Sequence, residues 1–231
     1  MEIRVFGDYE ELSKAGVEEV FSYLEKKKKS VICVATGESP RGIYNLFSSR
    51  KELFKEVTFL KLDEWGGIPV TDPCTCETYI TEVILSPLGL GKDKLVGFAT
   101  NPKDPVEECK RVKKIIEDIG GIDLAILGLG GDGHIGLNFP GEAIPNSIHI
   151  VSGEFLTHAL VKKAKEKPKY GFTLGFKEIL SSSKIILPVS GASKKVALKR
   201  LMCEELTSNL PASFLTLSRD LLILCDRESY E

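Results

Sequence analysis

Two adjacent carboxylates, Asp63 and Glu64, directly follow the apolar run Val57–Leu62. Acidic residues are poor strand formers, so we expect this pair in a loop at the end of a strand. A partly desolvated carboxylate at such a position can have a raised pKa and can abstract a carbon-bound proton as a general base. We therefore count both residues as candidate catalytic groups. The alternative is a pair of turn acids that face solvent.

A glycine-rich segment, residues 128–141, supplies a second candidate for proton transfer. Six of its fourteen residues are glycine, and Asp132 and His134 flank one of them. Histidine titrates near neutral pH, so His134 together with Asp132 could move protons on a bound ligand. The segment fits G-x-G-x-x-G, but Asn138 and Pro140 interrupt the helix that a dinucleotide site requires. The alternative is a histidine held in the core of a tight turn.

A third segment, Thr36–Gly42, follows the apolar run Ser30–Ala35 and has the features of an anion site. Gly37 allows the backbone to approach a ligand closely. The hydroxyls of Thr36 and Ser39, with the free N–H groups at the start of the next helix, would suit a phosphate. An ordinary strand-to-helix turn with a serine cap is the alternative.

A lysine at a predicted helix start completes the set of candidates. Lys194 follows the strand-like run Lys184–Val189 and the turn at residues 190–193. A cation at a helix N-terminus opposes the helix dipole, and a bound phosphate would compensate for that. The alternative is a surface lysine with no ligand.

The elements that must position these residues alternate between strands and helices along the chain. Apolar positions recur at helical spacing over residues 12–24 and 109–119. This alternation predicts an α/β fold in one domain, residues 1–231, with a doubly wound, mostly parallel sheet and helices on both faces. Such sheets bind ligands at the C-terminal ends of their strands. The predicted strands are Glu2–Phe6, Ser30–Ala35, Val57–Leu62, Ile122–Leu127, Lys184–Val189 and Leu221–Cys225.

Composition argues against several classes of function. The chain has 231 residues, 42% of them hydrophobic, and a net charge of −2, which argues against nucleic-acid binding. No apolar run approaches the ~20 residues of a membrane span, and the acidic first ten residues do not form a signal peptide. The six cysteines include no C-x-x-C pair and are typical of free thiols in the cytoplasm. The oligomeric state stays open, a homo-oligomer included.

Together these residues resemble a known family. The motifs Asp63-Glu64-Trp65, Ile68-Pro69 and Gly133-His134-Ile135 are similar to those of the glucosamine-6-phosphate deaminase/6-phosphogluconolactonase superfamily, over nearly the whole chain. The chain looks closest to the galactosamine-6-phosphate isomerase (deaminase) branch. The segments that carry this finer likeness are Lys61–Trp65, Thr75–Tyr79, Pro87–Leu90, Leu127–Gly130 and Leu210–Leu215.

The resemblance implies an enzyme with a modified Rossmann-like fold that uses neither a metal nor a nucleotide cofactor. Its substrate would be a small sugar phosphate, galactosamine 6-phosphate or glucosamine 6-phosphate. Asp132 and His134 would help to open the sugar ring. Asp63 would then move a proton from C2 to C1 through an enolamine, and hydrolysis of the ketose imine would release ammonia.

The resemblance also implies how the phosphate is bound. Thr36, Gly37 and Ser39 match the phosphate cradle of the family, and Lys194 matches its cation. Some members add an arginine, and the equivalent position in this chain is expected to hold His158, with Lys162 nearby.

One position departs from the deaminase pattern. The deaminases carry a glutamate before the proline of the glycine-rich loop, where it orients the catalytic histidine, and this chain has Phe139 there. Phe-Pro is typical of the lactonases, so a 6-phosphogluconolactonase in which His134 activates water is the first alternative. A sugar-phosphate-binding protein without catalysis is the second. Glu142 could replace the missing carboxylate.

Overall fold

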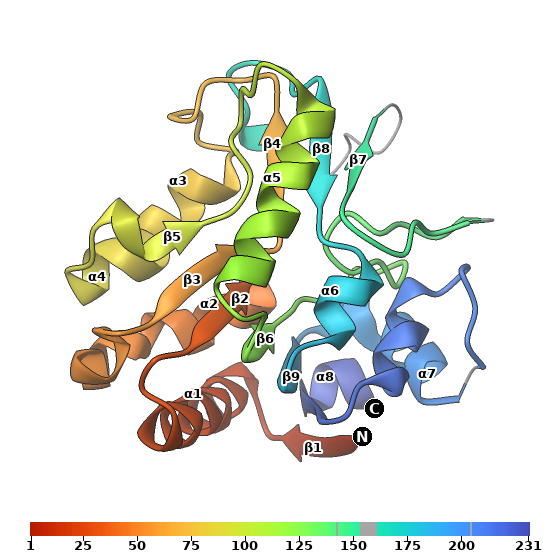
Figure 1. The fold of residues 1–231 in the computed structure, drawn as a ribbon. Helices are drawn as coiled ribbons and strands as arrows, with labels where there is room; N and C mark the ends of the chain where they lie inside the picture. The colour runs from red at the N-terminus through yellow and green to blue at the C-terminus, as the bar shows by residue number, and fades with distance from the viewer. Residues whose placement is uncertain (142, 153–160, 204) are drawn as a thin grey trace.

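The computed structural model describes residues 1–141, 143–152, 161–203 and 205–231 of the chain. Its largest element is a seven-stranded sheet in which each pair of neighbouring strands is parallel (Figure 1). In the order β1-β10-β9-β6-β2-β3-β5, the strands are Glu2–Phe6, Leu221–Asp226, Lys184–Val189, Leu124–Ile126, Val31–Val34, Thr58–Lys61 and Leu95–Val96.

Helices cover both faces of this sheet, which confirms the predicted doubly wound α/β fold. Along β2, Cys33 belongs to a core cluster that includes α5, α6 and α7, whereas Ile32 and Val34 belong to a cluster with α1, α2 and α3. Strands buried on both faces need apolar side chains at every position, which explains the continuous apolar runs in the sequence. The bounds are α1 Tyr9–Lys26, α2 Glu38–Asn45, α3 Cys76–Ile80, α5 Pro105–Asp118, α6 Phe176–Leu180 and α7 Lys195–Cys203.

Capping residues explain where the two long helices begin. The side chain of Asp8 accepts the backbone N–H of Glu11 at the start of α1, and Asp104 caps α5, which opens with a proline. Among the described residues, no helix is both long and apolar enough to span a bilayer. The shorter helices are α4 Ser86–Leu88 and α8 Arg227–Tyr230, the 3-10 segments Phe47–Phe54, Lys92–Lys94, Val161–Lys163, Ala192–Lys194 and Pro211–Leu217, and the π-helical turn Thr81–Leu85.

A second, antiparallel sheet corrects one expectation from the sequence. In the part of the chain that the structure describes, it has three strands, in the order β4 (Asp63–Gly66), β8 (Tyr170–Thr173) and β7 (His149–Val151). Asp63 and Glu64 therefore begin a strand, not a loop, and both are buried. Tertiary pairing with Thr173 and Phe172 of β8 overrides the low strand propensity of the two acids.

The topology places four predicted loops at one edge of the large sheet. β2, β3, β6 and β9 are consecutive neighbours and run in parallel, so the segments that follow them leave the same edge. The chain proceeds from β2 outward to β3 and β5, and then returns to form β6 on the other side of β2. The boundary between β2 and β6 is therefore a topological switch point, where open α/β sheets bind their ligands.

Candidate active site

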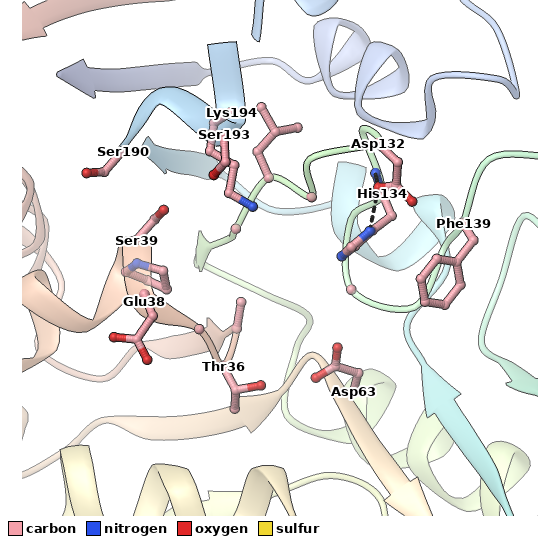
Figure 2. A pocket seen from close by; sticks show the side chains of 17 residues that line it. Thr36, Glu38, Ser39, Asp63, Asp132, His134, Phe139, Ser190, Ser193 and Lys194 are labelled. Carbon is pink, nitrogen blue, oxygen red and sulfur yellow. Dashed lines mark hydrogen bonds and ion pairs between the residues drawn. The ribbon is translucent and has the colours of Figure 1, made fainter. Parts of the chain in front are cut away.

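The four loops enclose a cavity of about 600 Å³, a size typical of sites for small molecules. Each loop contributes polar side chains to its wall, as Figure 2 shows. The cavity brings together seven residues that the sequence singled out, namely Thr36, Gly37, Ser39, Asp63, Asp132, His134 and Lys194.

One end of the cavity carries a cation and hydroxyl groups. Lys194 extends into it from the loop after β9, and Ser39 faces it from the start of α2 (Figure 2). Ser190 and Ser193, from the same loop as Lys194, line the same end. Burial lowers the pKa of Lys194, and the charge of Asp132 opposes this. The arrangement can bind an anion with one charge and several hydrogen-bond donors.

The start of α2 adds backbone donors to this end of the cavity. Gly37 precedes α2 with a φ of +154°, and no side chain caps the first turn. The first N–H groups of a helix have no partner within the helix, and the helix dipole favours an anion beside them. The amides near Ser39 are therefore placed to act together with Lys194.

Asp63 lies toward the other end of the cavity, where its side chain points into the open space (Figure 2). Only 9% of its surface is exposed. Burial raises the pKa of Asp63 to about 6, the hydrogen bond from Cys76 opposes this rise, and the charge of Glu64 adds to it. At neutral pH the carboxylate is thus mostly ionised yet more basic than an exposed one, as a general base requires.

Glu64 does not line the cavity, although we expected it beside Asp63 as a catalytic group. Its side chain is completely buried on the other side of β4. Oε1 accepts the backbone N–H groups of Trp65 and Cys76, and Oε2 accepts those of Glu77 and the ammonium group of Lys61. These bonds fix the start of α3 against the small sheet. Glu64 points away from the cavity because successive residues of a strand point to opposite faces of the sheet, and Asp63 points into it.

Asp132 and His134 form a hydrogen-bonded pair on the cavity wall (Figure 2). Oδ1 of Asp132 lies 2.6 Å from Nδ1 of His134 and also accepts the His134 backbone N–H. Partial burial would raise the pKa of Asp132, but the hydrogen bond to the His134 side chain, the charge of His134 and the backbone N–H donors together outweigh burial and lower that pKa to about 2. An ionised carboxylate can only accept, so Nδ1 donates and a neutral imidazole keeps its lone pair on Nε2.

Two glycines allow Asp132 and His134 to adopt this arrangement. Gly133 has a φ of +93°, a backbone conformation that residues with a side chain rarely adopt. A Cβ atom on Gly130 would lie 2.2 Å from Nδ1 of His134, so the imidazole needs the open space above this glycine. The glycine-rich composition of the loop therefore serves the placement of Asp132 and His134.

Phe139 packs against the imidazole at the position where the resemblance implied a glutamate. Its ring centroid lies 5.0 Å from that of His134, and it lines the cavity. The carboxylate of Asp132 is therefore one group that orients His134. Both Glu142, considered as a substitute, and His158, the predicted additional phosphate contact, lie outside the described residues.

Sequence reasoning missed three residues with a place in this site. Ser190 and Ser193 share the turn that leads to Lys194, and serines next to a predicted phosphate-binding lysine were the available signal. Cys76 lies within 3.3 Å of Asp63, thirteen residues further along the chain. No local pattern could reveal that contact, because it depends on the packing of α3 against β4.

Comparison with known proteins agrees with the fold. The model of the glucosamine-6-phosphate isomerases/6-phosphogluconolactonase family matches residues 9–223. The putative deaminase AgaI of Escherichia coli is 37% identical over 94% of this chain and 88% of its own length. A glucosamine-6-phosphate deaminase of Clostridium botulinum is 32% identical over 99% of this chain and 97% of its own length.

Two solved structures have the same fold as this chain. A monomeric glucosamine-6-phosphate deaminase superposes with a TM-score of 0.92 at 30% identity, covering 99% of this chain and 98% of its own. The 6-phosphogluconolactonase of Trypanosoma brucei superposes with a TM-score of 0.75 at 21% identity, covering 99% and 97%. The fold, together with these relatives, places the chain in a class of α/β enzymes. The chain belongs to the glucosamine-6-phosphate isomerase/6-phosphogluconolactonase family, which confirms the resemblance found in its sequence.

Proposed function

We propose that this enzyme converts a hexosamine 6-phosphate, galactosamine 6-phosphate or glucosamine 6-phosphate, to the ketohexose 6-phosphate and ammonia. One observation carries the proposal: a single cavity holds a buried carboxylate and an Asp–His pair toward one end, and a lysine with serine hydroxyls at the other. The names of relatives that match nearly the whole chain support it, since they are deaminases.

Ring opening is the first step that the Asp132–His134 pair can perform. The lone pair on Nε2 of His134 accepts the proton of the C1 hydroxyl, and the ring C–O bond breaks as the C1 aldehyde forms. The imidazolium returns this proton to the ring oxygen, which becomes the C5 hydroxyl. The ionised Asp132 stabilises the imidazolium that exists during the transfer.

Proton transfer between two carbons is the step for Asp63. The carboxylate removes the proton from C2 while O1 takes up a proton from the ammonium group of the substrate, which gives an enolamine with its double bond between C1 and C2. The same carboxyl group then returns the proton to C1, and a ketose imine results. Water adds at C2 and ammonia leaves. A base with a pKa of about 6 suits both halves of this exchange, because it can accept and return the proton near neutral pH.

Phosphate binding fixes the sugar relative to Asp63. Lys194, Ser39 and the first amides of α2 hold the dianion, and the serines of the loop after β9 add hydroxyl donors. The neutral hydroxyls of the sugar then lie between the two ends of the cavity. Holding the substrate at its unreactive end lowers the entropy cost of aligning C1 and C2 with the base.

The direct test is ammonia release by the purified protein. Galactosamine 6-phosphate and glucosamine 6-phosphate are supplied in parallel, with Asp63→Asn as the matched control. We expect ammonia from at least one sugar and its loss in the control, typically by ~10²–10⁴-fold for removal of a general base. The preferred sugar reveals the configuration at C4. No ammonia from either sugar would overturn the proposal.

The position of Phe139 favours a second candidate function, hydrolysis of 6-phosphogluconolactone. An aromatic ring against His134 removes one site for an orienting carboxylate, and His134 would then activate water while Asp63 would have no part in the chemistry. Lactone hydrolysis that survives Asp63→Asn but not His134→Ala would favour this reaction. Tight binding of a hexose 6-phosphate without either reaction would indicate a binding protein.

A further inference from the structure

Cys76 lies directly behind the proposed base. It is the first residue of α3, and only 2% of its surface is exposed. Its Sγ lies 3.3 Å from Oδ1 of Asp63 and 3.5 Å from Oγ1 of Thr36. The thiol therefore connects the base to a hydroxyl of the loop after β2.

The chemistry of the three groups decides which of them donates and which accepts in each hydrogen bond. An ionised carboxylate can only accept, so the single thiol proton points to Asp63. The sulfur then accepts the proton of Thr36. Burial, with the charges of Asp63 and Glu64, raises the pKa of Cys76 far above its usual range, so the thiol remains a donor and does not act as a nucleophile.

We propose that Cys76 is a positioning residue for Asp63: its S–H donates to Oδ1 and fixes the rotation of the carboxylate toward the substrate. The same hydrogen bond opposes the rise in the pKa of Asp63 that burial causes. The inference rests on the proposed function of Asp63 as the base. A thiol suits this task because it is a weaker donor than a hydroxyl. It holds the carboxylate in place while leaving it basic enough to accept a carbon-bound proton.

Other groups near Asp63 must be counted in any change of its pKa. The charge of Glu64 raises it, whereas His134 and Lys61 lower it. Cys33 and Tyr44, both completely buried, also interact with Asp63. None of these groups changes when Cys76 is replaced, so the effect of its thiol can be isolated.

The test measures the pKa of Asp63 directly, by carbon NMR titration of its side-chain carboxyl, assigned by its absence in Asp63→Asn. Cys76→Ala should raise this pKa by about 0.5 to 1 unit, the size expected for one hydrogen bond to the charged form. Cys76→Ser, which keeps a donor, should leave the pKa at or below the wild-type value. Cys74→Ala is the control, since that thiol is equally buried but interacts with Asp72.

The same variants give a kinetic readout. On the acidic side of the pH profile of kcat/KM for ammonia release, the apparent pKa should rise in Cys76→Ala by the amount that NMR measures. It should not rise in Cys76→Ser. An unchanged Asp63 pKa in Cys76→Ala, or equal shifts in the alanine and serine variants, would overturn the inference. A wild-type protein that releases no ammonia would instead refute the proposed function, and the titration would still decide whether the thiol holds the carboxylate.

Discussion

Asp63 acquires its basicity from burial, and the same burial works against the folded state once the carboxylate ionises. Its pKa rises from an ordinary value of 3.8 to about 6 in the folded chain, so the folded state binds this proton more tightly than the unfolded state. Stability from the protonated form is fully present below about pH 4 and is lost as the pH rises through about 6. The site thus contains a group that favours catalysis at the expense of stability.

Asp63→Asn should therefore stabilise the fold at neutral pH while it lowers ammonia release by the ~10²–10⁴-fold expected for loss of a general base. An amide does not titrate, and we expect a gain of up to about 3 kcal/mol in the free energy of unfolding above pH 7, falling toward zero near pH 4. Urea unfolding of both proteins at about pH 4.5 and about pH 7.5 measures the difference. A variant that is less stable than the wild type at the higher pH would contradict the environment assigned to Asp63.

Lys194→Ala should raise KM more than it lowers kcat. The charge-assisted contact to phosphate is present throughout the reaction, so its loss weakens the binding of substrate and transition state alike. We expect a rise in KM of roughly 10-fold or more. Lys195→Ala is the matched control, because the neighbouring side chain is exposed and does not line the cavity. A loss confined to kcat would refute the assignment of Lys194 as a phosphate anchor.

At the scale of elements, local patterns identified six of the seven strands described in the parallel sheet but none of the antiparallel ones. The six predicted strands all belong to the large sheet, because burial on both faces leaves continuous apolar runs in the sequence. β5 has two residues and no pattern of its own. β4 begins with two acids, and only its pairing with β8, more than a hundred residues later, makes it a strand. Because the two acids are successive residues of this strand, Asp63 points into the cavity and Glu64 points into the core on the other side.

The loop after β6 depends on Gly133, and Gly133→Ala should disturb the site more than the fold. The new Cβ would meet Leu210 at 2.3 Å in a backbone conformation that disfavours side chains. Strain at positive φ costs roughly 1–2 kcal/mol, and relief of the contact would displace Asp132 and His134. We expect a large loss of kcat, measured with ammonia release beside thermal unfolding.

Gly121→Ala separates the two effects. Gly121 has a φ of +89° but nothing within 4 Å of the added Cβ, and it lies outside the cavity. The Gly121→Ala variant should lose about as much stability as Gly133→Ala and keep its activity. Equal activity in the two variants would show that the conformation of the loop after β6 does not set the catalytic geometry.

At the scale of the whole molecule, the site exists only because strands distant in sequence are neighbours in the sheet. β6 lies between β9 and β2 in the sheet, so Lys194, in the loop after β9, faces the start of α2 across the switch point (Figure 2). The sequence indicated which loops follow strands, and parallel strands end at a common edge, so the candidate residues could be predicted as a group. The order of the strands, and hence which residues face each other, is a long-range property that no local pattern contains.

A ligand that bridges these loops should stabilise the entire fold. At 100 times its Kd, a ketohexose 6-phosphate product should add about 2.7 kcal/mol to the free energy of unfolding. For a chain of this size that corresponds to a rise in Tm of roughly 5–10 °C, measured by thermal unfolding. The unphosphorylated ketohexose and the Lys194→Ala variant should show little shift at the same concentration. Equal shifts with both sugars would exclude a phosphate-directed site.

The most direct test of the account is to follow the proton that Asp63 is proposed to move. Substrate labelled with deuterium at C2 is converted by the wild-type enzyme, and the ketohexose 6-phosphate product is analysed for label at C1. A single carboxyl group that removes and returns the proton should leave part of the deuterium at C1 and slow the reaction of the labelled substrate, and Asp63→Asn should form no such product. A product that carries no deuterium at C1 and forms as fast from labelled as from unlabelled substrate, or unchanged transfer in Asp63→Asn, would contradict the assignment of Asp63 as the base.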